Sequence, residues 1–178
     1  ITGITGQDGS YLAEYLISLN YDVWGIMRRT SLDPLMRLKT IVRSSHLHLL
    51  YGNLRDSAAI ARALKEARPD EIYNLAAQSD VGISFLCPEE TWEVNYTGAK
   101  RLIREAMRLF PKVRIYHAST SEMFGNTPPP QNEHSAFMPV SPYGKSKLKA
   151  YRELVKGYRT KHKIFICSGI LFNHESPR

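Results

Sequence analysis

The sequence predicts an α/β fold with helices on both faces of a doubly wound parallel sheet. Apolar runs of strand length alternate with helical patterns along the whole chain, as in repeated β-α units. A glycine-rich turn, the first in this series, lies between a strand end and an amphipathic helix. The chain has 178 residues, of which 43% are hydrophobic, and this suits one domain with a sizeable core. We therefore expect residues 1–178 to form a single Rossmann-type domain.

Local patterns predict the elements of the N-terminal half. Four apolar residues after the glycines recur at helical spacing and predict a buried helix face: Leu12, Tyr15, Leu16 and Leu19. Strands are expected at 23–27 and 47–51. A helix capped by Asp56 or Ser57 should run to about residue 67, before Pro69.

The same alternation continues to the end of the chain. Strands are expected at 72–77, 113–118 and 164–171, and long helices at 91–110 and 142–161. The segment 125–142 is a proline-rich loop longer than most connections, which indicates a binding or lid role. Both ends of the sequence look cut, so we expect a partial chain.

Composition narrows the class of partner. No apolar run approaches the roughly 18 residues of a membrane span, and we expect no membrane association. Cys87 and Cys167 lie far apart, which predicts a reduced, cytoplasmic protein whose two thiols are packing residues. The net charge of +7 favours anionic partners. No basic block interleaved with aromatics indicates nucleic acid. A phosphate-bearing cofactor and substrate are expected instead, and no metal site.

Gly3, Gly6 and Gly9 form the turn that opens the β-α series. Residues without a Cβ allow a tight turn and let backbone N–H groups approach a pyrophosphate at a helix N-terminus. Glycines are common in turns, so their spacing alone is weak evidence for dinucleotide binding. Its position after the first strand predicts dinucleotide binding.

Arg28 and Arg29 stand at the end of the strand expected at 23–27, where a carboxylate would favour NAD. Two guanidiniums followed by hydroxyls suit a 2′-phosphate, because arginine binds phosphate in a fork. The sequence thus predicts NADP. The alternative is an arginine-rich surface loop.

Tyr143 and Lys147 lie four residues apart at the start of a helix and share one face. A free tyrosine has a pKa of about 10, so a base active near neutrality needs about 4 kcal/mol of phenolate stabilisation. A neighbouring ammonium and a cationic nicotinamide could supply it, and we expect the pKa of Tyr143 to be lowered. The alternative is a solvated helix face, since Lys145 and Lys149 lie on the same helix.

Thr120 and Glu122 follow the strand expected at 113–118, and ligands of such sheets bind beyond the strands' carboxyl ends. Thr120 can hold a substrate hydroxyl or the tyrosine. Simple alcohol oxidation does not need the carboxylate of Glu122, and a second proton-transfer group indicates chemistry at the carbon next to the oxidised one. The alternative for Glu122 is helix capping or a surface salt bridge.

These motifs together resemble the extended short-chain dehydrogenase/reductase superfamily and, more narrowly, the GDP-mannose 4,6-dehydratase family. Six segments spread over the chain carry the resemblance: residues 3–12, 28–31, 74–79, 119–122, 141–144 and 169–178. The resemblance implies an NADP-dependent lyase that removes water from the sugar of GDP-mannose and yields a 4-keto-6-deoxy sugar.

The resemblance also implies roles for residues. Tyr143 would take the C4 hydroxyl proton and Glu122 the C5 proton, Thr120 would bond the substrate near C4, and Lys147 would hold the cofactor ribose and tune Tyr143. Ser121 has no assigned role. The cofactor would be lined by Gly3, Ile4, Thr5, Gly6, Gln7, Asp8, Gly9, Arg28, Arg29, Asn53, Leu54, Leu75, Ala76, Ala77, Gln78, Ser79, Lys147 and His174.

Three features depart from the family pattern. Asn53-Leu54 stands where Asp-Leu is usual, Glu90 stands where tyrosine is usual, and the loop 126–139 is about one residue short. The family's C-terminal substrate-binding part is expected beyond residue 178. The family also implies a homo-oligomer, a dimer or tetramer, with the helices 91–110 and 142–161 as contact surfaces.

Two other functions remain open at this point. A nucleotide-sugar 4-epimerase or 4-keto reductase on the same fold would need Tyr143 and Lys147 but not Glu122. A non-catalytic NADP-sensing module would keep only the turn, and the presence of Thr120, Tyr143 and Lys147 argues against it.

Overall fold

The strands of the computed structural model, which describes residues 1–178, all pair in parallel. Strand β1 (Val23–Met27) pairs with β2 (Leu47–Tyr51), with Val23 opposite Leu47. Strands β3 (Glu71–Asn74), β4 (Arg114–His117) and β6 (Ile166–Cys167) follow in that order. The short strands β5 (Ser119–Thr120) and β7 (Ile170–Leu171) pair beyond them.

Thr2 joins the two main groups of strands. It forms parallel bridges to Ile26 of β1 and Asn74 of β3. Its N–H donates to the Tyr73 carbonyl at 3.0 Å, and its carbonyl accepts from the N–H of Leu75 at 3.2 Å. The order is therefore β2, β1, Thr2, β3, β4, β6, which confirms the doubly wound parallel sheet. Thr2 and the last residues of β3 and β4 lie at the edge of the sheet that is formed by the carboxyl ends of the strands.

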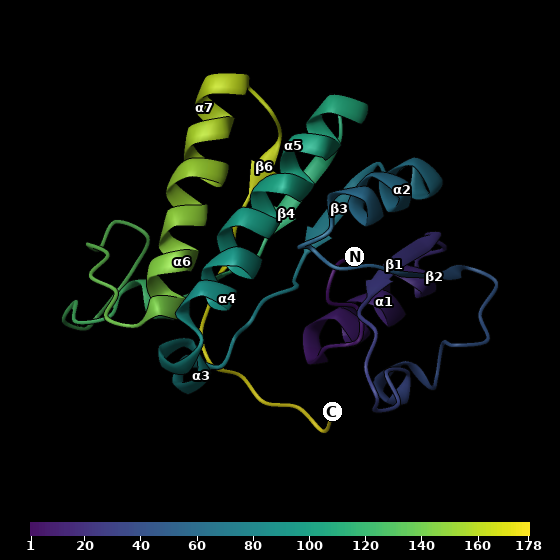
Figure 1. The fold of residues 1–178 in the computed structure, drawn as a ribbon, viewed down its shortest axis with the longest axis horizontal. Coiled ribbons are helices and arrows are strands. Elements are labelled where there is room, and N and C mark those ends of the chain that lie inside the picture. The colour runs from purple at the N-terminus through teal and green to yellow at the C-terminus, as the bar shows by residue number, and fades with distance from the viewer.

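The helices cover the sheet (Figure 1). They are α1 (Gln7–Ser18), α2 (Ser57–Ala67), α3 (Val81–Leu86), α4 (Pro88–Trp92), α5 (Ala99–Leu109), α6 (Pro142–Ala150) and α7 (Tyr158–His162). π-helical segments Glu93–Gly98 and Tyr151–Gly157 connect α4 to α5 and α6 to α7, and 3₁₀ turns span Met36–Leu38 and Ser121–Met123. The two long helical runs were expected. The π segments within them were not.

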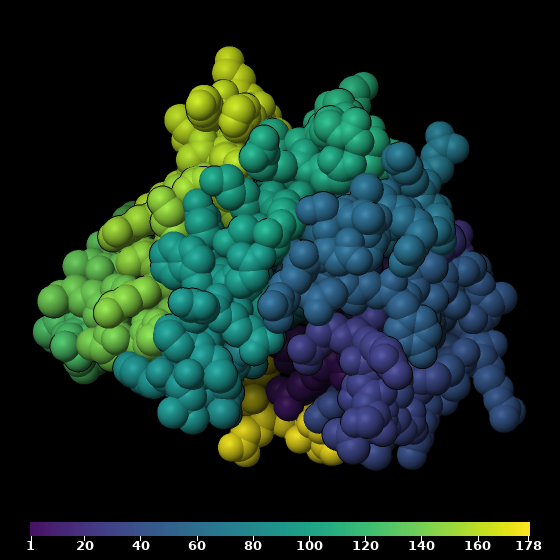
Figure 2. All heavy atoms as spheres, viewed as in Figure 1, coloured from purple at the N-terminus to yellow at the C-terminus, as the bar shows by residue number.

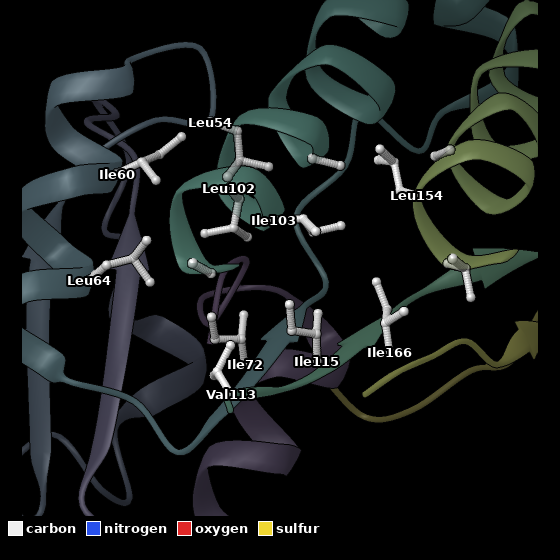
Figure 3. Close-up of a cluster of buried hydrophobic side chains, with 14 residues drawn as sticks. Leu54, Ile60, Leu64, Ile72, Leu102, Ile103, Val113, Ile115, Leu154 and Ile166 are labelled. Atoms are coloured by element: carbon white, nitrogen blue, oxygen red, sulfur yellow. The ribbon is translucent and has the colours of Figure 1, made fainter. Parts of the chain in front are cut away.

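The largest core cluster contains 14 buried residues between α2, α5, the second π segment and strands β3, β4 and β6. In Figure 3 their aliphatic side chains converge from the helices onto the strands, as Leu102, Ile103 and Ile115 do. Burying one such side chain contributes about 1.5–3 kcal/mol. This cluster packs the helices onto the half of the sheet that contains β3, β4 and β6. A second cluster, which includes Ile4 and Leu16, lies under α1.

The predicted apolar face of α1 was only partly right. Leu16 is buried and Leu12 packs against the cluster under α1, but Tyr15 and Leu19 are 61% and 50% exposed, and the buried side also carries Gly9 and Ala13. A Cβ on Gly9 would lie 2.2 Å from the carbonyl oxygen of Gly3. The helix therefore sits directly on the turn, and only small residues fit between them.

Three further expectations need correction. The strand expected at 72–77 ends at Asn74, because 75–77 leave the sheet to line the cleft, and the strand expected at 164–171 is two short strands, Ile166–Cys167 and Ile170–Leu171. Cys87 and Cys167 are both exposed rather than packed. Cys87 stands between α3 and α4, and Cys167 alternates with buried Ile166 on the edge strand β6. None of the helices combines the length and apolar character of a membrane span.

Candidate active site

A cleft of about 1080 Å³ opens at the carboxyl ends of the central strands. Figure 2 shows the surface hollowed around the purple N-terminal turn, with the yellow C-terminal segment along its edge. Most of the predicted site residues line it: Gly3, Thr5, Gly6, Gln7, Asp8, Gly9, Arg28, Asn53, Leu54, Leu75, Ala76, Ala77, Gln78, Ser79, Thr120, Tyr143, Lys147 and His174. Residues far apart in the sequence thus meet in one place.

Ile4 and Glu90 differ from what their positions suggested. The Ile4 side chain is fully buried in the cluster under α1 and does not line the cleft, so only the backbone of Ile4 is placed to contact a cofactor. Glu90 does line the cleft, where its carboxylate pairs with Arg55 Nη1 at 3.3 Å.

The glycine turn forms a cradle that side chains would fill. Gly3 has φ of +72°, in the left-handed region, and a Cβ there would lie 2.8 Å from the backbone nitrogen of Ala76. The N–H of Gly6 donates to the Gly3 carbonyl at 2.9 Å, which closes the turn at the start of α1. The free N–H groups of the first helical turn attract anions. This cradle fits the pyrophosphate of a dinucleotide.

A side pocket of about 680 Å³ adjoins the cleft at the end of β1. Arg28, Arg29 and Arg37 line it together with the Thr30 and Ser31 stretch. Arg37 donates through Nη1 to the carbonyl of Thr5 at 3.4 Å, so it links this pocket to the glycine turn. Sequence reasoning missed Arg37, because it stands outside the arginine motif in a 3₁₀ turn.

Tyr143 and Lys147 lie at the buried start of α6. Ser141 caps the helix by accepting from the N–H of Gly144 at 2.9 Å, and Pro142 occupies the first turn. Tyr143 is 8% exposed and Lys147 is 3% exposed, whereas Lys145 and Lys149 face solvent. The pair is therefore not a solvated helix face.

Lys147 carries its ammonium into the interior. Nζ donates to the carbonyl of Ala118 at 2.9 Å and lies 6.0 Å from the centre of the Tyr143 ring. Burial lowers the pKa of Lys147 to about 8. No carboxylate pairs with it, so the amine is held by one carbonyl and by the walls of the cleft.

The expectation of a lowered Tyr143 pKa was wrong for the protein alone. Burial raises the pKa of Tyr143, and the carboxylate of Glu122 raises it further. The hydroxyl of Thr120 lowers the pKa and only partly offsets these effects. A phenolate near neutral pH therefore requires a cation in the cleft in addition to Lys147.

Glu122 lies beside the cleft rather than on its wall. It belongs to the 3₁₀ turn Ser121–Met123, and its N–H donates to the Thr120 hydroxyl at 3.2 Å. Glu122 itself caps no helix and forms no ion pair, so neither alternative role describes it. A Cβ on Gly144 would lie 2.6 Å from its carbonyl oxygen, which shows how closely α6 approaches this turn.

Asn95 connects two walls of the cleft and was not singled out from the sequence. Its Oδ1 accepts from the N–H of Gln78 and its Nδ2 donates to the carbonyl of Gln78, both at 2.9 Å. Nδ2 also lies 3.2 Å from Oγ of Ser146 on α6. Asn95 is 1% exposed within a π-helical segment, a feature common at functional sites. A lone asparagine in a helical pattern was the available signal.

A buried polar chain runs under the cleft. The Thr2 hydroxyl donates to Asn74 Oδ1 at 2.6 Å, and Asn74 Nδ2 lies 2.9 Å from His117 Nδ1. Burial lowers the pKa of His117 to about 3, with a further contribution from Lys147. The imidazole is therefore neutral, and Lys147 supplies the only nearby buried positive charge.

Comparisons with known proteins agree with this geometry. The model of the family described as GDP-mannose 4,6 dehydratase matches residues 1–178. GDP-mannose 4,6 dehydratase 1 of Arabidopsis thaliana is 47% identical over 189 residues, covering 100% of this chain and 52% of the relative. The enzymes from Vibrio cholerae serotype O1 and Homo sapiens are 48% and 46% identical, with 100% of this chain and 50% of each relative covered. The chain thus spans about half the length of these curated relatives.

Solved structures share the fold. A dTDP-glucose 4,6-dehydratase from Streptomyces venezuelae, with NAD and TYD bound, is 25% identical with a TM-score of 0.84, over 94% of this chain and 53% of that one. A UDP-glucose 4-epimerase from Brucella ovis in complex with NAD is 21% identical with the same TM-score, over 97% and 50%. The second shows the fold alone.

Proposed function

This chain belongs to the GDP-mannose 4,6-dehydratase family, and from this premise we propose that residues 1–178 are the NADP-binding domain of a hydro-lyase. Its substrate is GDP-mannose, and its product is GDP-4-keto-6-deoxymannose. The observation that carries the proposal is the convergence of Thr120, Tyr143 and Lys147 on the cleft that holds the glycine turn, with Glu122 beside them. The reaction needs a nicotinamide cofactor, a base for the C4 hydroxyl proton and a second group that takes the C5 proton, and Tyr143 and Glu122 suit the last two roles.

Each residue at the cleft has a separate role in the proposed reaction. The glycine turn and Lys147 would hold a nicotinamide dinucleotide, which would supply hydride chemistry, with hydride accepted from C4 of the sugar and returned at C6. Tyr143 takes the C4 hydroxyl proton, and the buried ammonium of Lys147 stabilises the phenolate that Tyr143 needs for this. Thr120 orients the hydroxyl. Glu122 takes the C5 proton, which the C4 ketone acidifies, and passes it to the C6 hydroxyl, which leaves as water. The proton held by Tyr143 returns to C5 as hydride adds at C6.

The direct test is turnover. Incubating the full protein with NADP⁺ and GDP-mannose should yield a 4-keto-6-deoxy product, detected by mass spectrometry as the loss of one water from the sugar nucleotide. A C4-epimerised sugar of unchanged mass would instead support the epimerase. Binding of NADP⁺ without any product would support the sensing module.

Arg28 and Arg29 are proposed to select NADP over NAD. Replacing both with alanine should weaken NADP⁺ binding at least about 100-fold and leave NAD⁺ binding within about twofold, because each guanidinium on a phosphate contributes about 1.5–3 kcal/mol. Calorimetric titration of both cofactors measures this. Tighter binding of NAD⁺ than of NADP⁺ by the unaltered protein would refute the assignment.

The proposal also covers assembly and location. We place the protein in the cytoplasm, where its two unpaired cysteines stay reduced. We propose a homo-oligomer, a dimer or tetramer. Its contact surfaces are the helical runs α4–α5 and α6–α7, which lie side by side in Figure 1.

A further inference from the structure

The C-terminal strap, which we define as residues 172–178, crosses the mouth of the cleft. It leaves β7, which pairs with Ser119 and Thr120 on the wall that carries the proposed chemistry. All of its hydrogen bonds to other elements go to α1, on the opposite wall. Figure 1 shows this yellow segment running toward the purple half of the molecule. Residues 172–175 line the cleft, so the strap forms part of its wall.

The inner fastening of the strap is His174. Its Nδ1 donates to the Phe172 carbonyl at 2.7 Å, and its Nε2 lies 2.8 Å from Oδ1 of Asp8. Gln7 donates to the His174 carbonyl at 3.2 Å. The contact with Phe172, followed by that with Asp8, raises the pKa of His174. These contacts hold the part of the strap that faces the cleft.

The outer fastening is Arg178. Its Nη2 lies 2.6 Å from Oε1 of Glu14, and its Nη1 donates to the Ser10 hydroxyl at 3.2 Å. The guanidinium carbon stands 4.1 Å from the centre of the Tyr11 ring, in cation–π contact. The side chains of Arg178 and Glu14 are 20% and 25% exposed. An ion pair shielded in this way, with three anchors, holds its geometry better than an exposed pair does.

Glu14 also contacts a second segment of the chain. The same Oε1 accepts from the hydroxyl of Thr40, in the segment that follows the Arg28–Arg29 pocket. One carboxylate on α1 therefore holds both the strap and the segment that contains Thr40.

We propose that Glu14 and Arg178 are positioning residues for the cofactor, a role that rests on the proposed NADP binding. Their ion pair holds the strap on α1. The part of the cleft wall that residues 172–175 form is therefore already in place when the dinucleotide binds. A wall formed only part of the time lowers the apparent affinity by the fraction of molecules in which it is formed. Neither residue touches the cleft itself, since neither lines it.

The test compares Glu14→Gln and Arg178→Met in the full protein. Each should raise the Kd for NADP⁺ about tenfold, equivalent to about 1.4 kcal/mol, with kcat at saturating NADP⁺ within about twofold. Glu14→Gln distinguishes a positioning role of the ion pair from a direct effect of the Glu14 charge on the anionic cofactor. Removing a negative charge near an anionic ligand should tighten binding by attraction alone, whereas loss of the fastening weakens it. Arg108→Met is the matched control, because Arg108 pairs with Glu105 at 2.6 Å on α5, away from the cleft.

A second measurement is independent of cofactor binding. In the cofactor-free protein, chymotrypsin cleavage after Phe172, followed by mass spectrometry, should be about tenfold faster in both variants than in Arg108→Met, because local opening exposes the bond. The double variant should match the single ones, as expected for one shared contact. Unchanged cleavage, or unchanged Kd with NADP⁺ still bound, overturns the inference. If the unaltered protein binds no NADP⁺, the proposed function fails instead, and the cleavage rates still decide whether the ion pair fastens the strap.

Discussion

Lys147→Met should abolish turnover and at the same time make the fold more stable. Methionine keeps the length of the side chain but removes the ammonium, so the activity should fall at least about 100-fold. Burial lowers the pKa of Lys147 from 10.5 to about 8, so holding it charged at neutral pH costs the folded state about 3 kcal/mol. The Ala118 carbonyl loses its partner, at a cost of about 1–2 kcal/mol. The net gain in unfolding free energy should be about 1–2 kcal/mol.

The lowered pKa of Lys147 also determines how the stability of the fold changes with pH. Between pH 8 and 10.5 the unfolded chain holds a proton on Lys147 that the folded chain has lost, so this group's contribution makes stability rise with pH in that window. Below pH 8 the contribution is a constant penalty. In urea unfolding, the free energy of unfolding of the methionine variant should exceed that of the unaltered protein at pH 7, and by a smaller margin at pH 9.5. Lys145→Met removes an exposed lysine from the same helix and should change neither quantity. A methionine variant that is less stable at pH 7 would contradict a buried charge.

Glu122→Gln should stop dehydration and spare the first oxidation. Glutamine keeps the size and the turn but cannot accept the C5 proton, so formation of the 4-keto-6-deoxy sugar should fall about 10³-fold. Tyr143, Thr120 and Lys147 remain, so C4 oxidation continues and reduced cofactor accumulates. Stopped-flow absorbance of the reduced nicotinamide, with mass spectrometry of the sugar nucleotide, separates the two steps.

Glu133→Gln is the matched control for that variant. Glu133 is an exposed glutamate of the 125–142 loop that forms no ion pair, and its replacement should leave both steps unchanged. Undiminished dehydration in Glu122→Gln would refute the role of Glu122. It would also favour an enzyme that needs only the tyrosine and lysine, as an epimerase or 4-keto reductase does.

Elements with strong local signals were predictable from the sequence. The strands Val23–Met27 and Leu47–Tyr51 and the helix Ser57–Ala67 have the expected bounds, because apolar runs, a capping Asp56 and a following proline act over a few residues. The meeting of the glycine turn with Tyr143 was predictable too, because parallel strands end at one edge.

What the sequence left open depends on tertiary contacts. Leu19 has an apolar pattern but lies outside, because the close approach of Gly9 to the turn rotates α1 onto its small residues. The pKa of Tyr143 depends on burial that spacing does not report. Arg178 meets Glu14 across 164 residues of sequence, and Asn95 meets Gln78 inside a π segment. No local pattern encodes either contact.

The position of Thr2 in the sheet affects the order in which the sheet can assemble during synthesis. Thr2 belongs between β1 and β3, yet Glu71 leaves the ribosome about 4–14 s after Thr2 at typical rates of elongation. Through that interval β1 and β2 can pair, but one edge of Thr2 has no partner. An unpaired edge of this kind is where a nascent chain is open to wrong strand pairing and to chaperones. The interval ends when β3 emerges and takes its place beside Thr2.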